Sequence, residues 1–416
     1  MSTTALHENL VDTNSFLARS VLARFDRIES GLLTIYEAGH RHSFGAPNAS
    51  YPDAVIRVLD ARFWRAVALR GSVGAGEAYA NEWWSSDDPT AVVRLFTRNR
   101  AALEGIESGW AKFSRPVLGL YHSMRSNTER GSRENIAAHY DLSNAFFQLF
   151  LDETMTYSCG IFESQNTTMA EASIAKIDSI CSRLNLKPED HLLEIGTGWG
   201  AFAVRAAKKY GCRVTTTTIS REQHAVAAQR IREAGLESRV QLLQEDYRRL
   251  GGSFDKLVSV EVIEAVGHEY MDEFFKVCAA RIRPGGSMCL QAITIADRFY
   301  DSARKSVDFI QRHIFPGSCI PSVTSLCSSA ARATDLRLVH LEDIGRHYVR
   351  TLSEWGNALR SNWDKARSLG FTQQHLRLWE FYFCYCAGAF AERHISDVQM
   401  VFERPATTGT TTRRAQ

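Results

Sequence analysis

Two glutamates, Glu261 and Glu264, follow directly after the apolar run FDKLVSV. The segment SVEVIEAVGHEYM that contains them has no lysine or arginine to neutralise them. Carboxylates at the end of a buried strand can steady a positive charge that develops in a reaction or remove a proton. For Glu261 a structural alternative stays open, because an acid is also favoured at the N-terminal end of a helix by the helix dipole.

A glycine-rich loop lies upstream, in the segment LLEIGTGWGAFA. Gly196, Gly198 and Gly200 allow a tight turn from strand to helix and a close approach of the backbone to a ligand. The loop also fits the dinucleotide pattern GxGxxA, but the next strand ends in TTTTIS, without an acid for the ribose diol of NAD. Glu194 precedes the first glycine, where it could hold a cationic amino group. The pattern therefore resembles motif I of class I methyltransferases that use S-adenosylmethionine, rather than a plain structural turn or an NAD site.

From residue 135 onward, apolar patterns of strands and helices alternate. Such alternation predicts an α/β fold with a parallel sheet and helices on both faces, which binds ligands at the carboxyl ends of its strands. The predicted strands are 191–195, 213–219, 240–246, 256–260 and 287–295, and the predicted helices are 168–186, 201–211, 220–235 and 270–282.

The third of these strands leads into Asp246 and Tyr247. In class I methyltransferases an acid at this point commonly binds the adenine amine, so the pair is a candidate cofactor contact. The alternative is that Asp246 only caps the following turn, a position that aspartate favours.

Several further segments resemble one family, the cyclopropane-fatty-acid synthases and mycolic acid cyclopropane synthases. They are GSVGAGEAYANEWW, ENIAAHYDLSNAFFQLFLDETMTYSCGIF, TISREQ, QEDYRRL, RHIFPGSCIPSV and YCAGAFAERHISDVQMVFER, in this order and together spanning roughly residues 65–404. The resemblance implies a Rossmann-like class I methyltransferase fold with a mostly parallel seven-stranded sheet, plus a smaller and mostly helical N-terminal domain. It also implies a cofactor site made by Tyr157, Ser158, Glu194, Gly196, Thr197, Gly198, Gly200, Thr218, Ile219, Ser220, Gln223, Asp246 and Tyr247.

The chemistry implied by the resemblance is transfer of a methylene group from S-adenosylmethionine to the cis double bond of an acyl chain in a phospholipid. A carbocation forms, a base removes a proton and a cyclopropane ring closes. The family base is thought to be a bound bicarbonate, and Glu264, Tyr348, Cys159 and Ile293 match its protein contacts. Cys386 matches a cysteine once proposed as a nucleophile. Because the alkene itself attacks, a buried apolar role for Cys386 is the better interpretation.

The sequence departs from the family at the predicted base. Gln291 replaces the family histidine, and glutamine can donate a hydrogen bond but cannot transfer a proton. Glu261 stands where a small residue is usual, Ile263 and Ala265 replace a phenylalanine and a histidine, and the loop reads Gly-Thr-Gly at Thr197. We therefore expect a base that differs from the standard arrangement, either Glu261 or a re-seated bicarbonate. A methyl- or methylene-branched product is the alternative to a ring.

The composition is that of an ordinary globular protein. The chain has 416 residues, a net charge of +2 and nine cysteines without a CxxC pair, which predicts no nucleic-acid partner, no metal site and reduced thiols in a cytoplasmic setting. The first residues do not resemble a signal peptide, and no uncharged apolar run reaches the ~18 residues that span a bilayer. Any contact with a membrane should therefore be peripheral, at its inner face.

Four segments are expected. They are an N-terminal domain at 1–100 for membrane or dimer contact, a basic aromatic linker at 101–134, the methyltransferase domain at 135–404 and a disordered tail at 405–416. The linker is either a solvated helix or a face that rests on anionic lipid. It carries Trp110, Lys112, Phe113, Arg115, Tyr121, Arg125, Arg130 and Arg133. An acyl channel is expected beside segments 135–162 and 297–390, and a homodimer is expected from the resemblance alone. A non-catalytic lipid-binding relative is the rival from another class, which the intact glycine loop disfavours.

Overall fold

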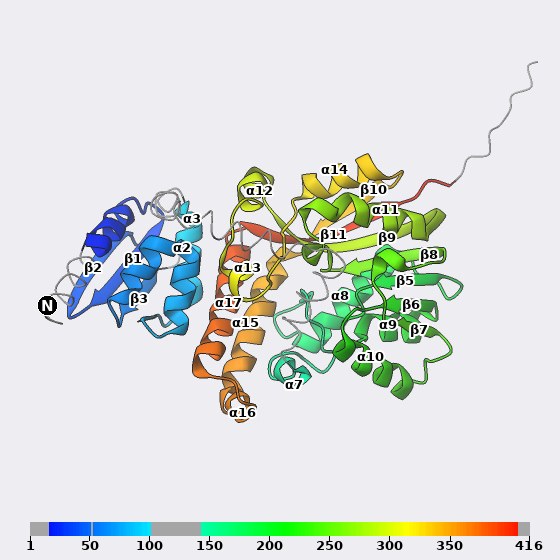
Figure 1. The fold of residues 1–416 in the computed structure, drawn as a ribbon, viewed down its shortest axis with the longest axis horizontal. Coiled ribbons are helices and arrows are strands. Elements are labelled where there is room, and N and C mark those ends of the chain that lie inside the picture. Colours follow the sequence, from blue (N-terminus) through cyan, green and yellow to red (C-terminus); the bar gives the residue numbers. More distant parts are fainter. Residues whose placement is uncertain (1–15, 51–52, 101–142, 407–416) are drawn as a thin grey trace, which may run out of the picture. The chain divides into compact units, whose positions relative to one another are not determined.

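The computed structural model describes residues 16–50, 53–100 and 143–406 (Figure 1). The chain forms two compact units. The first unit comprises Met1–Arg125, Ser302–Pro316 and Tyr348–Ile395, and the second comprises Ser126–Asp301, Gly317–His347 and Ser396–Gln416. The predicted linker at 101–134 and all but two residues of the predicted tail lie outside the described residues.

The second unit is built on a seven-stranded sheet of order β10-β11-β9-β8-β5-β6-β7. Its strands are β5 (His191–Ile195), β6 (Arg213–Thr217), β7 (Val240–Leu243), β8 (Phe254–Val260), β9 (Ile282–Ile295), β10 (Arg337–Asp343) and β11 (Ile395–Glu403). The five strands from β9 to β7 are parallel to their neighbours, and β10 is antiparallel to β11. The mostly parallel seven-stranded sheet that the sequence predicts is confirmed.

Helices cover both faces of this sheet (Figure 1). One face packs against α11 (Met271–Arg281) and α14 (Val323–Ala333), and the other against α8 (Met169–Arg183), α9 (Ala201–Arg205) and α10 (Arg221–Glu233). The alternation of side chains along a strand explains this, since Leu193 belongs to the first core and its neighbour Leu192 to the second.

The strand order places a topological switch beside β5. The chain runs outward from β5 to β6 and β7, and then returns to β8 on the other side of β5. The loops after β5 and β8 therefore lie side by side at the carboxyl edge of the sheet, where ligands bind in folds of this kind. Both segments with which the sequence analysis began, the glycine loop and the two glutamates, lie at this edge.

The first unit contains a four-stranded sheet that the sequence did not predict, of order β2-β1-β3-β4. Its strands are β1 (Gly31–Glu37), β2 (His40–Ala46), β3 (Ala54–Val58) and β4 (Trp84–Ser85). The helices of this unit are α2 (Arg62–Ala80), α3 (Pro89–Arg98), α13 (Phe309–His313), α16 (Trp363–Ser368), α17 (Gln373–Ala391) and most of α15 (Gly345–Ser361), and residues 16–25 are helical as well. Close packing accounts for a glycine in α2, because a Cβ on Gly76 would lie 2.4 Å from the ring of Phe309.

The aromatic residues of α17 form core within the first unit. Trp379, Phe381 and Phe383 are buried there, as the sequence analysis expected for most of this segment. Glu380 on the same helix is buried and accepts hydrogen bonds from Tyr79 Oη (2.9 Å) and from Arg360 Nη2 (2.6 Å), which satisfies its charge inside the unit.

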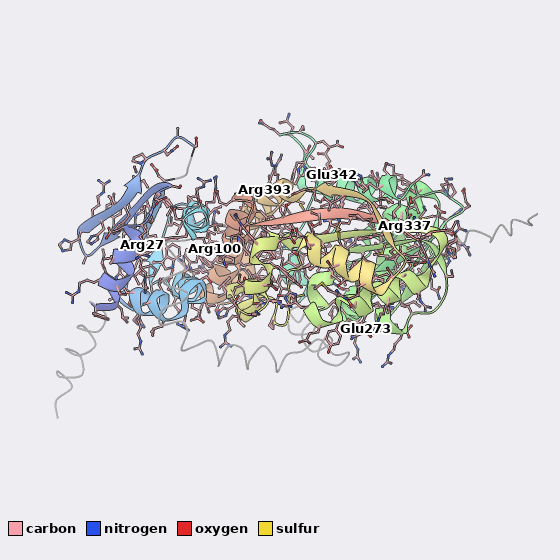
Figure 2. All side chains as sticks on the ribbon, turned by 90° about the horizontal axis from the view of Figure 1, so that it is seen from above. Arg27, Arg100, Glu273, Arg337, Glu342 and Arg393 are labelled. Carbon is pink, nitrogen blue, oxygen red and sulfur yellow. The ribbon has the colours of Figure 1, made fainter. Side chains whose placement is uncertain are left out.

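The remaining described elements are short. They are α7 (Asn144–Phe147), α12 (Asp297–Ala303), a π-helical turn at Ala206–Tyr210 and 3₁₀ turns at Tyr247–Arg249, Ile263–Ala265 and His268–Tyr270. The edge strand β10, on which Figure 2 labels Arg337 and Glu342, is exposed along its whole length. Among the helices of the described residues, none combines the length and the apolar character needed to cross a bilayer.

Candidate active site

The glycine loop after β5 makes close contact with the segment after β8. Gly196, Gly198 and Gly200 all have positive φ, at 97°, 53° and 92°, so the turn uses the conformational freedom of glycine at each position. A Cβ on Gly196 would lie only 2.4 Å from Cγ2 of Val262. The predicted cofactor loop and the predicted catalytic segment are thus adjacent, with glycine required at the point of contact.

Glu194 is buried at the end of β5, 3% exposed. Thr216 donates a hydrogen bond to its Oε2 (2.6 Å), and the hydroxyl groups of Thr216 and Thr197 are themselves 2.5 Å apart. Burial raises the pKa of Glu194 to about 8, against the lowering effects of Thr216 and Lys176. A cationic group bound beside it would favour the ionised carboxylate, which suits the predicted contact with a cofactor amine.

The predicted cofactor residues after β6 form a hydrogen-bonded start to α10. Ser220 caps the helix by accepting from the Gln223 N–H (3.3 Å), and Thr218 Oγ1 donates to Gln223 Oε1 (2.9 Å). Ile219 between them is half-buried. These contacts give Thr218, Ser220 and Gln223 a structural role at the start of α10, and their contact with the cofactor stays a prediction.

Asp246 is buried after β7 and both of its carboxylate oxygens accept from Arg248, at 2.9 Å and 2.8 Å. It also caps the 3₁₀ turn that follows by accepting from the Arg248 N–H (3.0 Å). Tyr247 packs its ring edge-on against Phe274, with the centroids 5.5 Å apart. Asp246 thus has the capping role that the sequence left open, and its predicted contact with adenine stays a prediction.

At the end of β8 the chain turns sharply at Glu261, a non-glycine residue with φ of 50°. Backbone of this kind is strained for a side chain with a Cβ and is often found at functional sites. Its carboxylate Oε1 accepts two hydrogen bonds, from the Cys159 N–H (3.0 Å) and from Gln291 Nε2 (2.8 Å). Glu261 precedes a short 3₁₀ turn and no N-terminal end of an α-helix, so the helix-dipole interpretation is not supported.

Glu264 lies one turn further on and is held by backbone. Its Oε1 accepts from the Ile293 N–H (2.6 Å), and its carbonyl oxygen accepts from the Cys319 N–H (2.7 Å). Its Oε2 is buried and has no hydrogen-bond partner within the described part of the chain. Burial, and after it the charge of Glu261, raises the pKa of Glu264 to about 8. The carboxyl is therefore mostly protonated near neutral pH.

Gln291 on β9 connects Glu261 to the neighbouring strand β11. The β8–β9 register pairs Val260 with Gln291, and the Gln291 Nε2 donates to Asp397 Oδ2 (2.9 Å) as well as to Glu261. Its Oε1 accepts from Gln399 Nε2 (3.0 Å). Because the acceptor side of the amide is occupied by Gln399, its donor side is fixed toward the two carboxyls.

Asp397 and Lys176 complete the cluster, and the sequence analysis missed both. Asp397 is fully buried on β11, with Oδ1 unpartnered among the described residues. Burial and the charges of Glu261 and Glu264 raise its pKa well above the ordinary value. Lys176 on α8 is buried and donates to Ser158 Oγ (2.9 Å), and burial lowers its pKa against the opposing effect of Glu261. Asp397 and Gln399, two apart in an apolar strand, were the signal that could have found this side of the site.

The other predicted residues are placed as follows. Cys159 contributes its backbone N–H, while its Sγ lies 3.4 Å from the carbonyl oxygen of Gly160. Tyr157 packs against Phe147, with the ring centroids 5.4 Å apart. Tyr348 and Cys386 belong to the first unit, where Tyr348 stacks on Phe390. Burial raises the pKa of the Cys386 thiol, which disfavours a thiolate nucleophile.

Comparisons with known proteins identify the family of this chain. A family described as mycolic acid cyclopropane synthetase matches residues 127–400. The tuberculostearic acid methyltransferase of Mycobacterium tuberculosis is 34% identical over 86% of this chain and 85% of its own length. The cyclopropane-fatty-acyl-phospholipid synthase of Escherichia coli K12 is 33% identical over 88% of this chain and 91% of its own. A crystal structure of a mycolic acid cyclopropane synthase complexed with SAH and CTAB is 32% identical, with a TM-score of 0.59, over 65% of this chain and 98% of that one.

Proposed function

This chain belongs to the mycolic acid cyclopropane synthetase family, and we propose that it transfers the methyl group of S-adenosylmethionine to the cis double bond of an unsaturated fatty acyl chain and forms a cyclopropane ring. Enzymes of this family use S-adenosylmethionine and modify lipids. The substrate we propose is an acyl chain of a phospholipid at the inner face of a membrane, to which the protein binds peripherally. The homodimer expected from the sequence is part of the same proposal.

The observation that carries the proposal is the gathering of carboxyls after β8, next to the glycine loop after β5. Glu261 and Glu264 lie within this segment, and Val262 between them contacts Gly196. An alkene that receives a methyl cation becomes a carbocation, and preorganised carboxyl groups stabilise such a charge more strongly in a water-excluded site than in water.

The residues around the glycine loop fit S-adenosylmethionine, which supplies an electrophilic methyl group when it is bound. Glu194 is suited to the amino group, because burial keeps its carboxyl ready to ionise beside a cation. Gly198 lets the backbone approach the ligand, since an added Cβ there would meet nothing within 4 Å among the described residues, whereas Gly200 packs against Ala227. Asp246 is the candidate for the adenine amine.

The protein groups then act on the acyl chain. Glu264 lies where it offsets the charge of the cation, and the Gln291 amide orients the neighbouring carboxylate. The backbone N–H groups of Cys159 and Ile293 hold the carboxyls of Glu261 and Glu264 in place. A base removes a proton from the added methyl group, and the pair of electrons of that C–H bond closes the ring.

A branched acyl chain is the second candidate product, because this sequence differs from the family at the residues predicted to hold the base. Gln291 replaces a histidine and Glu261 adds a carboxyl, so the cation can be deprotonated differently and leave a methylene- or methyl-branched chain. Relatives of this chain at 33–34% identity carry names of both kinds, a cyclopropane synthase and a fatty-acid methyltransferase.

The two products are separated by one labelling experiment. Purified protein is incubated with methyl-deuterated S-adenosylmethionine and vesicles of monounsaturated phospholipid, and the acyl chains are analysed by mass spectrometry before and after mild hydrogenation. A ring keeps two deuteriums and resists hydrogenation, a methylene branch keeps two and is reduced, and a chain that loses its own proton keeps three. A lipid without any gain in mass would refute the proposed function.

A further inference from the structure

Glu261 and Glu264 accept hydrogen bonds from the two backbone N–H groups that were expected to hold a bicarbonate. The sequence predicts that the backbone at Cys159 and Ile293 helps to hold a bicarbonate. In the structure the Cys159 N–H donates to Glu261 Oε1 (3.0 Å) and the Ile293 N–H donates to Glu264 Oε1 (2.6 Å). A backbone N–H donates one good hydrogen bond, so both donors are already used by side chains of this protein.

Charge argues against an additional anion in the same place. Glu261, Glu264 and Asp397 lie together, and the pKa values of Glu264 and Asp397 are raised in part by the charge of Glu261. The buried cation whose pKa responds to this cluster is Lys176. Another anion brought beside these groups would meet the charge of Glu261 in a site that screens charge poorly, where that charge already disfavours ionisation of Glu264 and Asp397. The residues present do not fit a bound bicarbonate.

Of the three carboxyls, Glu261 is placed to exchange a proton with a ligand. Asp397 is fully buried, and Glu261 and Glu264 are both half-buried residues, but the Oε2 of Glu264 is enclosed and has no hydrogen-bond partner among the described residues. Gln291 Nε2 donates to both Glu261 and Asp397, at 2.8 Å and 2.9 Å, and so holds the two carboxyls side by side. The φ of 50° at Glu261 is the backbone conformation that directs the side chain to these donors.

We propose that the Glu261 carboxylate is the resident base of this enzyme and takes the place of a bound bicarbonate, with Gln291 and Asp397 as its positioning residues. This inference rests on the proposed function. The π electrons of the alkene form the bond to the methyl carbon, and the broken sulfur–carbon bond leaves its electron pair on a neutral sulfur. Glu261 takes a proton from the added methyl group, the C–H electron pair closes the ring, and the proton passes from the half-buried carboxyl to solvent.

The direct test is binding of carbon-13-labelled bicarbonate, followed by NMR, to the wild-type protein and to Glu261→Gly. Glycine accepts the positive φ at this position and removes the carboxylate, which frees the Cys159 N–H. We expect the variant to bind bicarbonate and the wild type to show no binding at the same concentration. Binding to the wild type, or to neither protein, would overturn the inference. This readout does not depend on the lipid reaction, so it decides about Glu261 even if no lipid is methylated.

Activity gives a second test in buffer stripped of carbon dioxide. The wild type should keep its rate, and Glu261→Gln should lose about 100-fold or more in kcat, as expected for loss of a general base. Added bicarbonate should restore at least about tenfold to Glu261→Gly and nothing to the wild type. Glu269→Gln, an exposed carboxylate of the same segment, is the matched control. A wild type that requires bicarbonate, or a fully active Glu261→Gln, would refute the role of Glu261.

The positioning role of Asp397 has its own readout. Burial and the neighbouring carboxyls raise the pKa of Asp397. Asp397→Asn keeps the shape of the side chain and mimics the protonated form that this shift favours, whereas Asp397→Ala removes the polar group. We expect Asp397→Ala to lower kcat by about tenfold with little change in KM, and asparagine to restore most of the loss. Equal losses in the two variants, with folding intact, would show that Asp397 acts as an ionised group and would overturn this part of the inference.

Discussion

Glu264→Gln should change the pH dependence of stability in a predictable direction. The pKa of this carboxyl is raised from 4.5 to about 8 by burial and by the charge of Glu261. Between these two pH values the folded protein keeps a proton that the unfolded chain releases. The contribution of Glu264 to the free energy of unfolding is therefore fully present below pH 4.5 and is lost as pH rises toward about 8. Glutamine mimics the protonated form at every pH.

The size of the effect follows from the proton that is retained. One retained proton lowers the free energy of unfolding by at most about 1.4 kcal/mol per pH unit, or about 5 kcal/mol over the whole interval. The difference in Tm between Glu264→Gln and the wild type should then grow by up to about 2 °C per pH unit for a chain of 416 residues. The buried Oε2 is replaced by an amide nitrogen in the variant, and the cost of this change is the same at every pH. The slope is therefore the diagnostic quantity.

The assay is thermal unfolding of both proteins at pH 5, 6, 7 and 8. Glu189→Gln, at an exposed position of the second unit, makes the same chemical change and should give a flat difference. The contribution of Glu194 cancels between the two proteins, whereas the pKa of Asp397 falls in the variant because the charge of Glu264 helps to raise it. A Glu264→Gln difference that does not change with pH would show that Glu264 is ionised in the folded protein, and the account of the carboxyl cluster would be wrong.

Three further changes test other parts of the structure. Glu194→Gln should weaken binding of S-adenosylhomocysteine in calorimetry by about tenfold or more, and it should abolish a rise in wild-type affinity toward pH 8, because a cation favours the ionised carboxylate. Gly196→Ala should lower Tm and cofactor affinity more than Gly198→Ala does, since both have positive φ but only the first Cβ meets another atom, at 2.4 Å, among the described residues. Glu380→Ala should cost about 2–3 kcal/mol in unfolding, because Tyr79 Oη loses its buried partner.

The sequence predicted the central strands of the second unit, such as β5, β6 and β9, because they are largely buried. The run HLLEI was predicted as a strand at 191–195, and β5 has those bounds. The sequence did not predict the sheet of the first unit, because β2 (HRHSFGA) is largely exposed and has no alternating apolar pattern. The glycines of α2 lower its helix propensity, so the sequence did not indicate one long helix there. Gly76 is explained by its close packing against Phe309.

The site was predicted in its parts and not in its connections. Glu261, Glu264 and Gln291 were identified from motif positions, but strand register brings Gln291 beside Glu261 and carries Asp397 in from a strand more than 100 residues later. Lys176 looked like one more polar residue of an amphipathic helix. Hydrogen bonds across a sheet depend on pairing that a single sequence does not state, so the network required a structure.

The carboxyl cluster is difficult to explain as a stabilising feature. Removing carboxyls from water is costly, and here burial, and after it the charge of Glu261, raises the pKa values of Glu264 and Asp397. Apolar side chains of similar size would fill the same space without unpartnered oxygens at Glu264 and Asp397. A site that keeps such groups is better explained by a reaction that brings its own positive charge. A carbocation that forms beside the cluster is attracted to the charge of Glu261 and favours the ionised forms of the neighbouring carboxyls, so the arrangement favours the transition state over the resting protein.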